Sequence, residues 1–476
     1  MAAITPEGRV KPHKIGTTLI LSHPSRGRTP IRTALTGANG GYGRTFLAQL
    51  SRTPEILPAI LIDPDIAGVR RMLDELGIPA GRVDEATDAH RTAEIVDDGL
   101  TALVSSADAV DWTRVDVLVE ACGKVGYGSA YAAAAIEGGA HVVMVSKEVD
   151  TVVGPALAAR AATKGLSYLP GDGDQPANLL RLIEWVSAVG LDIVAVGKSG
   201  EYDLQFNPVT GTVTQAGETV DAPELADLLE LGDDVAATLD QRAAAVQNLK
   251  RAAAADACEM TVVATRTGTL ADIESMRYPV ARIDELADIY ANRAHGGILE
   301  HDGVVDVFSA LRLPGEASFA GGVFAVVRTG DTATWETLRN KGHVISKDGR
   351  YACIYWPYHY MGVETPLTVH AAMDRTPSRP VRPSILLAAR ATEDLPTGTQ
   401  LKVTGHHHEI AGVAPVMIDP ARTIAPYYLL DGARLVRPVS KGALIGHADV
   451  EDVDAGAHEL FFEGTAHLNT TTGVNQ

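Results

Sequence analysis

Three glycines at three-residue intervals follow a short apolar stretch and precede a helical pattern. Gly37 allows a tight turn, and the missing side chain of Gly40 lets a phosphate reach the backbone N–H groups at the start of a helix predicted over residues 44–50. The spacing, G-x-x-G-x-x-G, is one residue longer than the commoner G-x-G-x-x-G. The residues predicted to bind a dinucleotide here are Gly37, Asn39, Gly40, Gly41, Tyr42 and Gly43.

An acidic residue stands where a dinucleotide-binding unit needs one. A second apolar stretch, residues 57–62, ends on Asp63, twenty residues after Gly43, where a carboxylate can accept hydrogen bonds from ribose hydroxyls. This favours NAD over NADP. Arg70 and Arg71 on the following helical pattern could meet a 2′-phosphate, so both cofactors stay open.

Two more strands are predicted next, over residues 115–120 and 141–145, with an Ala-rich helix at 129–137 between them. The predicted elements follow in the order of a dinucleotide-binding unit: strand, glycine turn, helix, acidic strand end and further strand–helix units. This order favours nucleotide binding over a purely structural turn. The first of these two strands runs into a turn that completes the predicted cofactor site, Ala121-Cys122-Gly123.

Two carboxylates, Asp172 and Asp174, lie two residues apart in a glycine-rich loop. In an extended conformation both side chains point to the same side, where they could hold a Mg²⁺ ion or divide acid and base roles. The alternative is an Asx turn that caps a helix beginning at Ala177. Both residues are candidate metal ligands, and Asp174 is also a candidate catalytic residue.

Further candidate groups lie downstream. Lys198 and Glu201 follow a strand predicted at 191–196 and form a second catalytic pair, with a surface ion pair as the alternative. His359, in an aromatic run, is a candidate proton donor or a buried core histidine. The sequence His-His-His-Glu at 406–409 suggests metal binding, but three adjacent side chains cannot all converge on one ion.

The composition is that of a globular protein acting on a small molecule. With 476 residues the chain is too long for one core, and no apolar run approaches the roughly 20 residues that span a bilayer. A net charge of −19 without a Lys/Arg cluster argues against nucleic acid. Three widely separated cysteines fit reduced thiols. We expect a cytoplasmic protein without a membrane or nucleic-acid partner.

The fold class expected from these patterns is α/β, with a Rossmann-type nucleotide domain, an α+β catalytic domain and a small β-rich domain. A linker rich in Pro and Arg precedes the β-rich domain. The predicted segments are a loose leader at 1–28, the dinucleotide-binding domain at 29–155, the catalytic domain at 156–375, the β-rich domain at 384–451 and a loose tail at 452–476.

Over roughly residues 29–451 the chain resembles the homoserine-dehydrogenase-like NAD(P)-dependent oxidoreductases whose C-terminal part is a SAF-type domain. This group includes the 1-deoxy-D-xylulose-5-phosphate reductoisomerase-like enzymes. The glycine turn has instead the spacing of dihydrodipicolinate reductases, so the resemblance does not carry over the substrate. The motifs that carry the resemblance are the strand–turn–helix at 31–50, the run at 142–148, Gly171–Pro176, Gly197-Lys198 and Tyr351–Glu364.

The resemblance implies hydride transfer between a nicotinamide and a small hydroxylated carbonyl compound or its alcohol, in a homodimer or larger homo-oligomer. It places Ser146-Lys147 facing the nicotinamide, where a lysine can polarise a carbonyl or take a proton from an alcohol. Lys198 and Asp174 would then handle protons or orientation. The alternative for Lys147 is a solvated surface lysine.

Three functions therefore stay open. In a reductoisomerase, a divalent cation at the acidic residues would chelate a hydroxyketone before its reduction. A homoserine-dehydrogenase-like enzyme would act on an amino-acid substrate. A non-catalytic sensor or scaffold would keep the nucleotide-binding domain without the chemistry.

Overall fold

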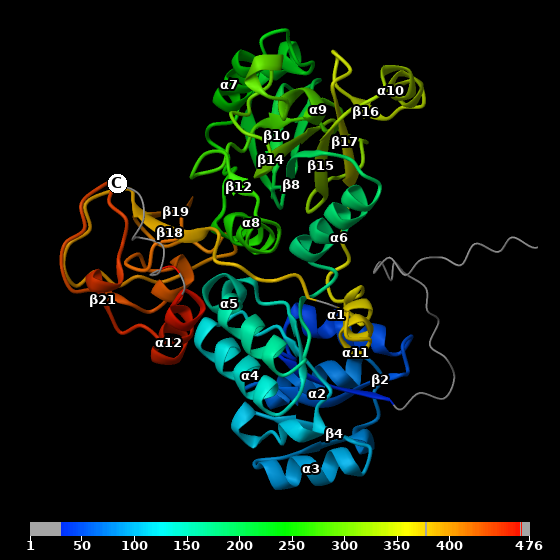
Figure 1. The fold of residues 1–476 in the computed structure, drawn as a ribbon, viewed down its shortest axis with the longest axis vertical. Coiled ribbons are helices and arrows are strands. Elements are labelled where there is room, and N and C mark those ends of the chain that lie inside the picture. The colour runs from blue at the N-terminus through cyan, green and yellow to red at the C-terminus, as the bar shows by residue number, and fades with distance from the viewer. Residues whose placement is uncertain (1–29, 377, 467, 469–476) are drawn as a thin grey trace, which may run out of the picture.

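The computed structural model describes residues 30–376, 378–466 and 468 (Figure 1), so the predicted leader lies outside the described residues. The first unit is a seven-stranded sheet in which all strands run parallel, in the order β3-β4-β2-β1-β5-β6-β7. The strands are short apolar runs because both faces of the sheet are covered. Their bounds are β1 Ile31–Thr36, β2 Ile56–Ile62, β3 Val83–Glu85, β4 Thr101–Val104, β5 Val117–Glu120, β6 His141–Met144 and β7 Tyr168–Pro170.

Helices pack on both faces of this sheet, which confirms the predicted Rossmann-type domain. The helix that begins at Lys147 contains Pro155 in its interior. One face carries α1 (Gly41–Leu50), α2 (Ile66–Glu75) and the later α11 (Thr365–Met373), and the other carries α3 (Ala89–Asp97), α4 (Val125–Glu137) and α5 (Lys147–Thr163). Short 3₁₀ turns are η1 Ala80–Arg82, η2 Ala107–Ala109 and η3 Trp112–Arg114.

The second unit is built on a ten-stranded mixed sheet with the path β11-β10-β9-β14-β8-β15-β17-β16, and β12 and β13 pair with β14 beside this path. The sheet contains both parallel and antiparallel neighbours, which confirms the predicted α+β architecture. The strands are β8 Ile193–Ser199, β9 Leu204–Asn207, β10 Thr212–Gln215, β11 Glu218–Asp221, β12 Leu270–Ala271, β13 Val280–Ala281, β14 Val304–Arg312, β15 Val323–Arg328, β16 Val344–Ile345 and β17 Tyr351–Trp356.

Two helices of the second unit, α6 and α8, pack on its sheet, and α8 also packs against α5 of the first unit (Figure 1). Residues on α8 therefore face the carboxyl edge of the parallel sheet. The helices of this unit are α6 Gln175–Ala188, η4 Pro223–Leu228, α7 Val235–Ala245, α8 Ala254–Thr267, η5 Ile283–Glu285, α9 Leu286–Ile289, η6 Arg293–His295 and α10 Thr332–Arg339.

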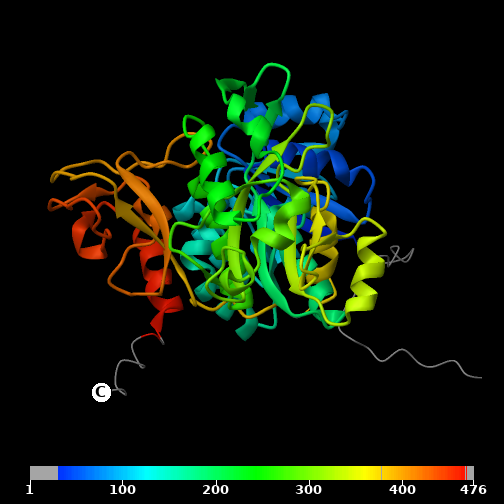
Figure 2. The ribbon, with the colours of Figure 1, turned by 90° about the horizontal axis from the view of Figure 1, so that it is seen from above.

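The third unit is a small set of strand pairs and turns that lies beside the other two (Figure 2). The prediction of a loose tail from residue 452 is wrong, because a helix follows there and buries Leu460 and Phe461 against α5 and α4. The large apolar residues of this segment, Leu460, Phe461 and Phe462, form one run, so the sequence shows no helical periodicity there. The elements are β18 Leu386–Ala391, β19 Val413–Ile418, η7 Tyr427–Leu430, β20 Arg434–Leu435, η8 His447–Asp449, β21 Val450–Glu451 and α12 Ala455–Gly464.

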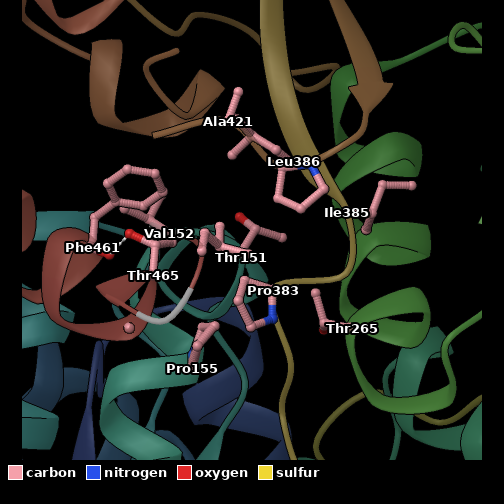
Figure 3. A pocket seen from close by; sticks show the side chains of 13 residues that line it. Thr151, Val152, Pro155, Thr265, Pro383, Ile385, Leu386, Ala421, Phe461 and Thr465 are labelled. Carbon is pink, nitrogen blue, oxygen red and sulfur yellow. Dashed lines mark hydrogen bonds between the residues drawn. The ribbon is translucent and has the colours of Figure 1, made fainter. Parts of the chain in front are cut away.

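A mainly apolar pocket of about 400 Å³ lies where α12, α5 and the start of the third unit meet (Figure 3). Phe461 and Val152 line one part of it, and Ile385 and Leu386 line another. Its lining residues include no ionisable side chain, so this pocket offers no group for acid–base chemistry. Within the described part of the chain, no helix combines the length and apolar character needed to cross a membrane.

If α12 is an integral part of the fold, Phe461→Ala should destabilise the protein by about 3–5 kcal/mol, the usual cost of removing a buried phenylalanine ring. Phe461 is 4% exposed. Chemical denaturation of the full chain measures the change. The control is Val209→Ala at a residue that is 91% exposed, which should cost less than about 0.5 kcal/mol. Similar, small effects in the two variants would contradict the packing of this helix.

Candidate active site

The glycine turn lies at the carboxyl edge of the parallel sheet, between β1 and α1. Gly37 has a φ of +62°, and a Cβ on it would lie 2.5 Å from the carbonyl oxygen of Ala121. A Cβ on Gly43 would lie 2.5 Å from the carbonyl oxygen of Ala38. The first and last glycines are therefore required by the close approach of β1, α1 and the turn after β5.

The N-terminus of α1 is open. Gly40 is the N-cap residue and provides no side-chain cap, and the first turn of α1 contains no acidic residue. A Cβ on Gly41 would meet a single neighbour, the Met361 side chain, at 3.8 Å. Unpaired N–H groups and the positive end of the helix dipole make such a helix start a suitable place for a phosphate.

Asp63 lies at the end of β2, beside the glycine turn, as predicted. Its two carboxylate oxygens accept backbone N–H bonds from Asn39 (2.9 Å) and Asp65 (2.9 Å), which hold the carboxylate beside the turn. The two arginines considered for a 2′-phosphate are paired with carboxylates. Arg70 lies 2.7 Å from Glu85, and Arg71 lies 3.8 Å from Asp65.

The turn at Ala121–Gly123 lies at the same edge of the sheet. It is held by Glu120, whose Oε1 accepts hydrogen bonds from the Thr36 hydroxyl (3.1 Å) and the Cys122 N–H (3.0 Å). The Gly123 N–H donates to the Ser146 hydroxyl at 2.8 Å. Burial, reinforced by the Glu120 charge, raises the pKa of the Cys122 thiol, so this thiol is protonated and a poor nucleophile.

Tyr42, another predicted cofactor ligand, points toward the loop after β7 and the start of α11. Its hydroxyl contacts the Thr365 hydroxyl and donates to the Asp172 carbonyl oxygen at 3.5 Å. The segment before Thr365 packs on the same helix, because a Cβ on Gly362 would lie 2.9 Å from the Tyr42 carbonyl oxygen. Tyr42 therefore fixes the loops around the site.

Lys147 begins α5 and joins carboxylates from two elements of the second unit. Its Nζ lies 3.5 Å from Asp174 Oδ1 and contacts Glu259 Oε1. The other oxygen of Glu259 contacts Lys198 Nζ, which lies 2.7 Å from Asp256 Oδ1. We call these five residues the lysine–carboxylate cluster. It brings together Lys147, Asp174 and Lys198, three of the four predicted catalytic residues.

Neighbouring opposite charges determine the protonation states of Lys147 and Glu259 in the cluster. Burial by itself lowers the pKa of Lys147, but Asp174, Glu259 and Glu148 outweigh it and raise this pKa well above its ordinary value. Burial alone would raise the pKa of Glu259. The two lysines lower this pKa by more than burial raises it, so the net shift is downward. Lys147 is thus an ammonium cation and Glu259 a carboxylate at neutral pH.

The members of the cluster differ in exposure. The side chains of Lys147 and Asp174 are 20% and 17% exposed, whereas those of Lys198 and Glu259 are 2% and 3% exposed. A substrate can reach the first two. Lys198 lies behind them and acts on the site through Glu259, so its role is positioning.

Glu148, which sequence reasoning missed, lies next to Lys147 and is buried. Burial raises its pKa to about 7, although Lys147 partly opposes the shift. His408 Nδ1 lies 3.5 Å from its Oε1 and 3.0 Å from the Tyr428 hydroxyl. A carboxyl group with a pKa near 7 is suited to proton transfer. Its place directly after Lys147 was the available sequence signal.

Asp256 and Glu259 were also missed. They lie three residues apart on α8, so they share one face of the helix. Most of the helix around them is buried, and its buried residues between Ala257 and Ala264 are mainly apolar. Two acidic residues within such an apolar helix were the signal that sequence analysis could have used, because buried carboxylates require partners.

The expectation that Asp172 and Asp174 point to one side is wrong. Gly173 between them has a φ of +88°, so the loop turns instead of running extended. Asp172 forms a two-oxygen ion pair with Arg181 and accepts from the Thr368 hydroxyl. Asp174 caps α6 at Gln175 N–H (3.1 Å), which agrees with the capping alternative, and also faces Lys147.

These contacts leave Asp172 and Asp174 poorly suited to a shared cation, because each already faces a positive side chain. Among the described residues, no group of three or more His, Cys, Asp or Glu side chains is placed to hold a metal ion. The residues present therefore do not fit the proposed divalent site.

The predicted pairing of Lys198 with Glu201 is wrong. Lys198 points to α8, and Glu201, past the end of β8, lies 2.5 Å from His406 Nε2. The His359 Nδ1–H donates to the Gly321 carbonyl oxygen at 3.1 Å, so this side chain connects two loops. The three adjacent histidines diverge, as expected, with His406 at Glu201 and His408 at Glu148.

Comparison with protein-family models gives one match in the second unit. Residues 173–365 match the model described as "Oxidoreductase DRL, catalytic domain". These residues include Asp174, Lys198, Asp256 and Glu259 of the cluster. The match confirms the expectation of an oxidoreductase enzyme, and the sheet before it provides a Rossmann-type nucleotide domain. A search of curated proteins finds no match to the chain.

Solved structures with similar folds are distant in sequence. A putative oxidoreductase from Klebsiella pneumoniae is 17% identical, covering 74% of this chain and 88% of its own, with a TM-score of 0.34. GenD2 from gentamicin A biosynthesis, in complex with NAD, is 16% identical over 75% and 90%, with a TM-score of 0.34. DOX-P reductoisomerase with magnesium is 18% identical over 36% of this chain and 46% of its own, less than half its length, with a TM-score of 0.27.

Glu259 provides a test of the cluster. We expect Glu259→Gln to lower the free energy of unfolding by about 3–5 kcal/mol at neutral pH, because it leaves two buried lysines short of a negative charge. The pKa of Glu259 is lowered in the folded state, so its stabilisation is complete above the unfolded pKa and disappears as pH falls through the folded pKa. The difference from wild type should be full above about pH 5 and shrink below about pH 4.

Chemical denaturation across this pH range measures the effect. The matched control is Glu316→Gln, which removes one partner of an ion pair at the surface, 2.8 Å from Arg282, and should cost less than about 1 kcal/mol. Equal losses for the two variants, or a difference that does not depend on pH, would show that Glu259 is not a buried carboxylate between two lysines.

Proposed function

We propose that the protein is a NAD-dependent oxidoreductase that transfers a hydride to or from a small hydroxylated carbonyl compound. The observation that carries the proposal is the position of Lys147. It stands at the carboxyl edge of the nucleotide-binding sheet and faces Asp174 and Glu259 from the segment that matches an oxidoreductase catalytic domain. Ligands of open α/β sheets bind at that edge.

The residues around the glycine turn fit a dinucleotide. The uncapped start of α1 would hold the pyrophosphate, and Asp63 at the end of β2 would meet the adenosine ribose. NAD is favoured over NADP because Arg70 and Arg71 both face carboxylates. When bound, the nicotinamide supplies the two-electron donor or acceptor.

Lys147 would act as a cation. Its raised pKa keeps it protonated, so it can donate a hydrogen bond to the substrate oxygen and stabilise negative charge that develops there. Asp174, which is also partly exposed, orients the ammonium group from one side, and Glu259 orients it from the other. Two fixed carboxylates leave Lys147 little freedom to turn away from the substrate.

Proton transfer would fall to Glu148. Its pKa of about 7 lets it exist in both protonation states near neutral pH, which suits a group that exchanges a proton with a hydroxyl. His408 and Tyr428 connect it to the third unit. The tuned pKa values of this buried group and its neighbours support an enzyme over a non-catalytic sensor.

The proposal also includes the resemblance to homoserine dehydrogenases and to SAF-type domains. A lysine directly after a strand of the nucleotide domain, here β6, supports the homoserine-dehydrogenase-like resemblance, and the short strands of residues 384–451 suit a SAF-type domain. We do not assign the amino-acid substrate or the carbon-skeleton rearrangement, because no contact described above favours either one.

Gly41→Asp should weaken NADH binding at least tenfold, about 1.4 kcal/mol, by placing a carboxylate where the pyrophosphate would lie. The new side chain has room, and an acidic residue in the first turn favours the helix, so the melting temperature should stay the same or rise. Fluorescence titration of NADH and NADPH measures the affinities.

Gly41→Ala is the control, because it adds a Cβ without charge and should keep most of the affinity. Wild-type protein should bind NADH more tightly than NADPH. The cofactor proposal fails if wild type binds neither cofactor, or if Gly41→Asp binds NADH as wild type does.

Lys147→Ala should lower kcat by about 10²–10⁴ while leaving NADH affinity within about twofold, because the lost cation acts on the substrate oxygen. The assay follows nicotinamide absorbance with a panel of hydroxylated carbonyl compounds and polyols. Lys164→Ala is the control, since that lysine pairs with Glu137 on the surface. A wild-type enzyme that turns over one of these compounds and a Lys147→Ala variant of equal kcat would contradict the assigned role.

A further inference from the structure

A polar pocket of about 300 Å³ adjoins the lysine–carboxylate cluster. It is bounded by the loop after β8, the segment before α8, strand β14 and the turn of the third unit that carries His407. Asp256 belongs to both places, since it lines the pocket and lies 2.7 Å from Lys198 Nζ. The pocket thus borders the cluster directly, at Asp256.

Two polar groups that line the pocket have no partner within the described residues. Ser309 on β14 is 2% exposed, and its buried hydroxyl makes no hydrogen bond. The Nδ1 atom of His407 is likewise buried and unpartnered. A buried polar atom without a hydrogen-bond partner lowers the stability of the fold. When such an atom lines a cavity, a bound ligand can provide the missing hydrogen bond.

A positive charge in the same wall also lacks a counter-ion. Arg251 is partly buried, and its Nη1 donates to the Tyr278 carbonyl oxygen at 2.8 Å. In the described part of the chain no carboxylate lies within ion-pair distance of Arg251, and burial without compensation lowers its pKa. The half-buried guanidinium of Arg181, by contrast, faces the carboxylate of Asp172.

The remaining charges of the pocket are engaged elsewhere. Asp256 faces Lys198, Glu201 is hydrogen-bonded to His406, and Lys250 contacts Glu409. The pocket also includes Ala253, the N-cap of α8, which provides no side-chain cap. The first turn of this helix contains Asp256, and the Ala254 N–H donates to the His407 carbonyl oxygen at 3.1 Å, so the positive charge left unpaired in this wall, within the described residues, is that of Arg251.

We propose that this pocket binds an anionic group of the substrate, a carboxylate or a phosphate, with Arg251 as its counter-charge and Ser309 and His407 as hydrogen-bond partners. The inference rests on the proposed function, because it makes the pocket a binding place for a charged group of the substrate, beside the cluster that holds Lys147. It narrows the substrate to a hydroxylated carbonyl compound that carries a negative charge. The guanidinium suits either anion, since both accept two parallel N–H bonds.

The test measures the binding of inorganic phosphate and of acetate, separately, to the full-length protein by isothermal titration calorimetry. All proteins carry Gly41→Asp, so that the start of α1 does not compete for the anion. We expect Arg251→Gln to weaken the preferred anion at least tenfold and Ser309→Ala to weaken it severalfold. Arg251→Lys should retain an intermediate affinity. The anion that binds more tightly identifies the chemical group.

The matched control is Arg293→Gln, which removes a surface arginine paired with Glu300 outside the pocket and should leave anion affinity unchanged. Circular dichroism and melting temperature verify that each variant folds, and Ser309→Ala keeps the test decisive if Arg251→Gln does not fold. Unchanged affinity for both anions in the folded pocket variants overturns the proposal, as does the absence of anion binding to the parent protein.

NADH binding, measured on the same substitutions in the wild-type background, separates this inference from the proposed function. If NADH binds and the pocket variants keep full anion affinity, the anion pocket is wrong and the cofactor proposal stands. If NADH does not bind and anion affinity is lost in Arg251→Gln, the pocket stands and the cofactor proposal fails.

Discussion

The site depends on one buried carboxylate, Glu259, held between two lysines from different units. Moving three such groups out of water costs several kcal/mol each, and their attraction repays this only when the geometry is good and all are present. Lys147 comes from the helix after β6, Lys198 from β8 and Glu259 from α8. The cluster therefore fixes the second unit against the nucleotide domain, and the same contact that joins the domains sets the charge and direction of the group offered to a substrate.

Other contacts between the two units keep the residues of the cluster in their relative positions. Arg266 on α8 lies 2.7 Å from Asp150 on α5, and the Tyr168 hydroxyl donates to the same aspartate at 2.9 Å. On the other side of the site, α11 returns to the nucleotide domain, where Thr368 contacts Asp172. The loop that carries Asp174 is thus held from both directions. A misplacement of about 1 Å can cost two orders of magnitude in rate, so such support has a direct consequence for chemistry.

Sequence reasoning succeeded where a local pattern determined the structure. The glycine turn, the parallel strands and the position of Lys147 follow from short apolar runs and from backbone needs that glycine alone meets, as at Gly37. It failed where partners are distant in sequence. Lys198 and Glu201 are neighbours along the chain, but the fold turns Lys198 toward α8, more than fifty residues away. Likewise the positive φ of Gly173, which no periodicity predicts, sends Asp172 and Asp174 to different cations.

The charge distribution connects these local features. A protein with a net charge of −19 repels small anions in general, so an anionic substrate requires a place where the local field is reversed. The structure offers such places. The uncapped start of α1 and the guanidinium of Arg251 present positive charge that no carboxylate pairs within the described residues, and Lys147 presents an ammonium group held by Asp174 and Glu259. The negative net charge of the chain makes these groups the favourable places for a negatively charged cofactor and substrate, and the buried carboxylate of Glu259 keeps Lys147 in place.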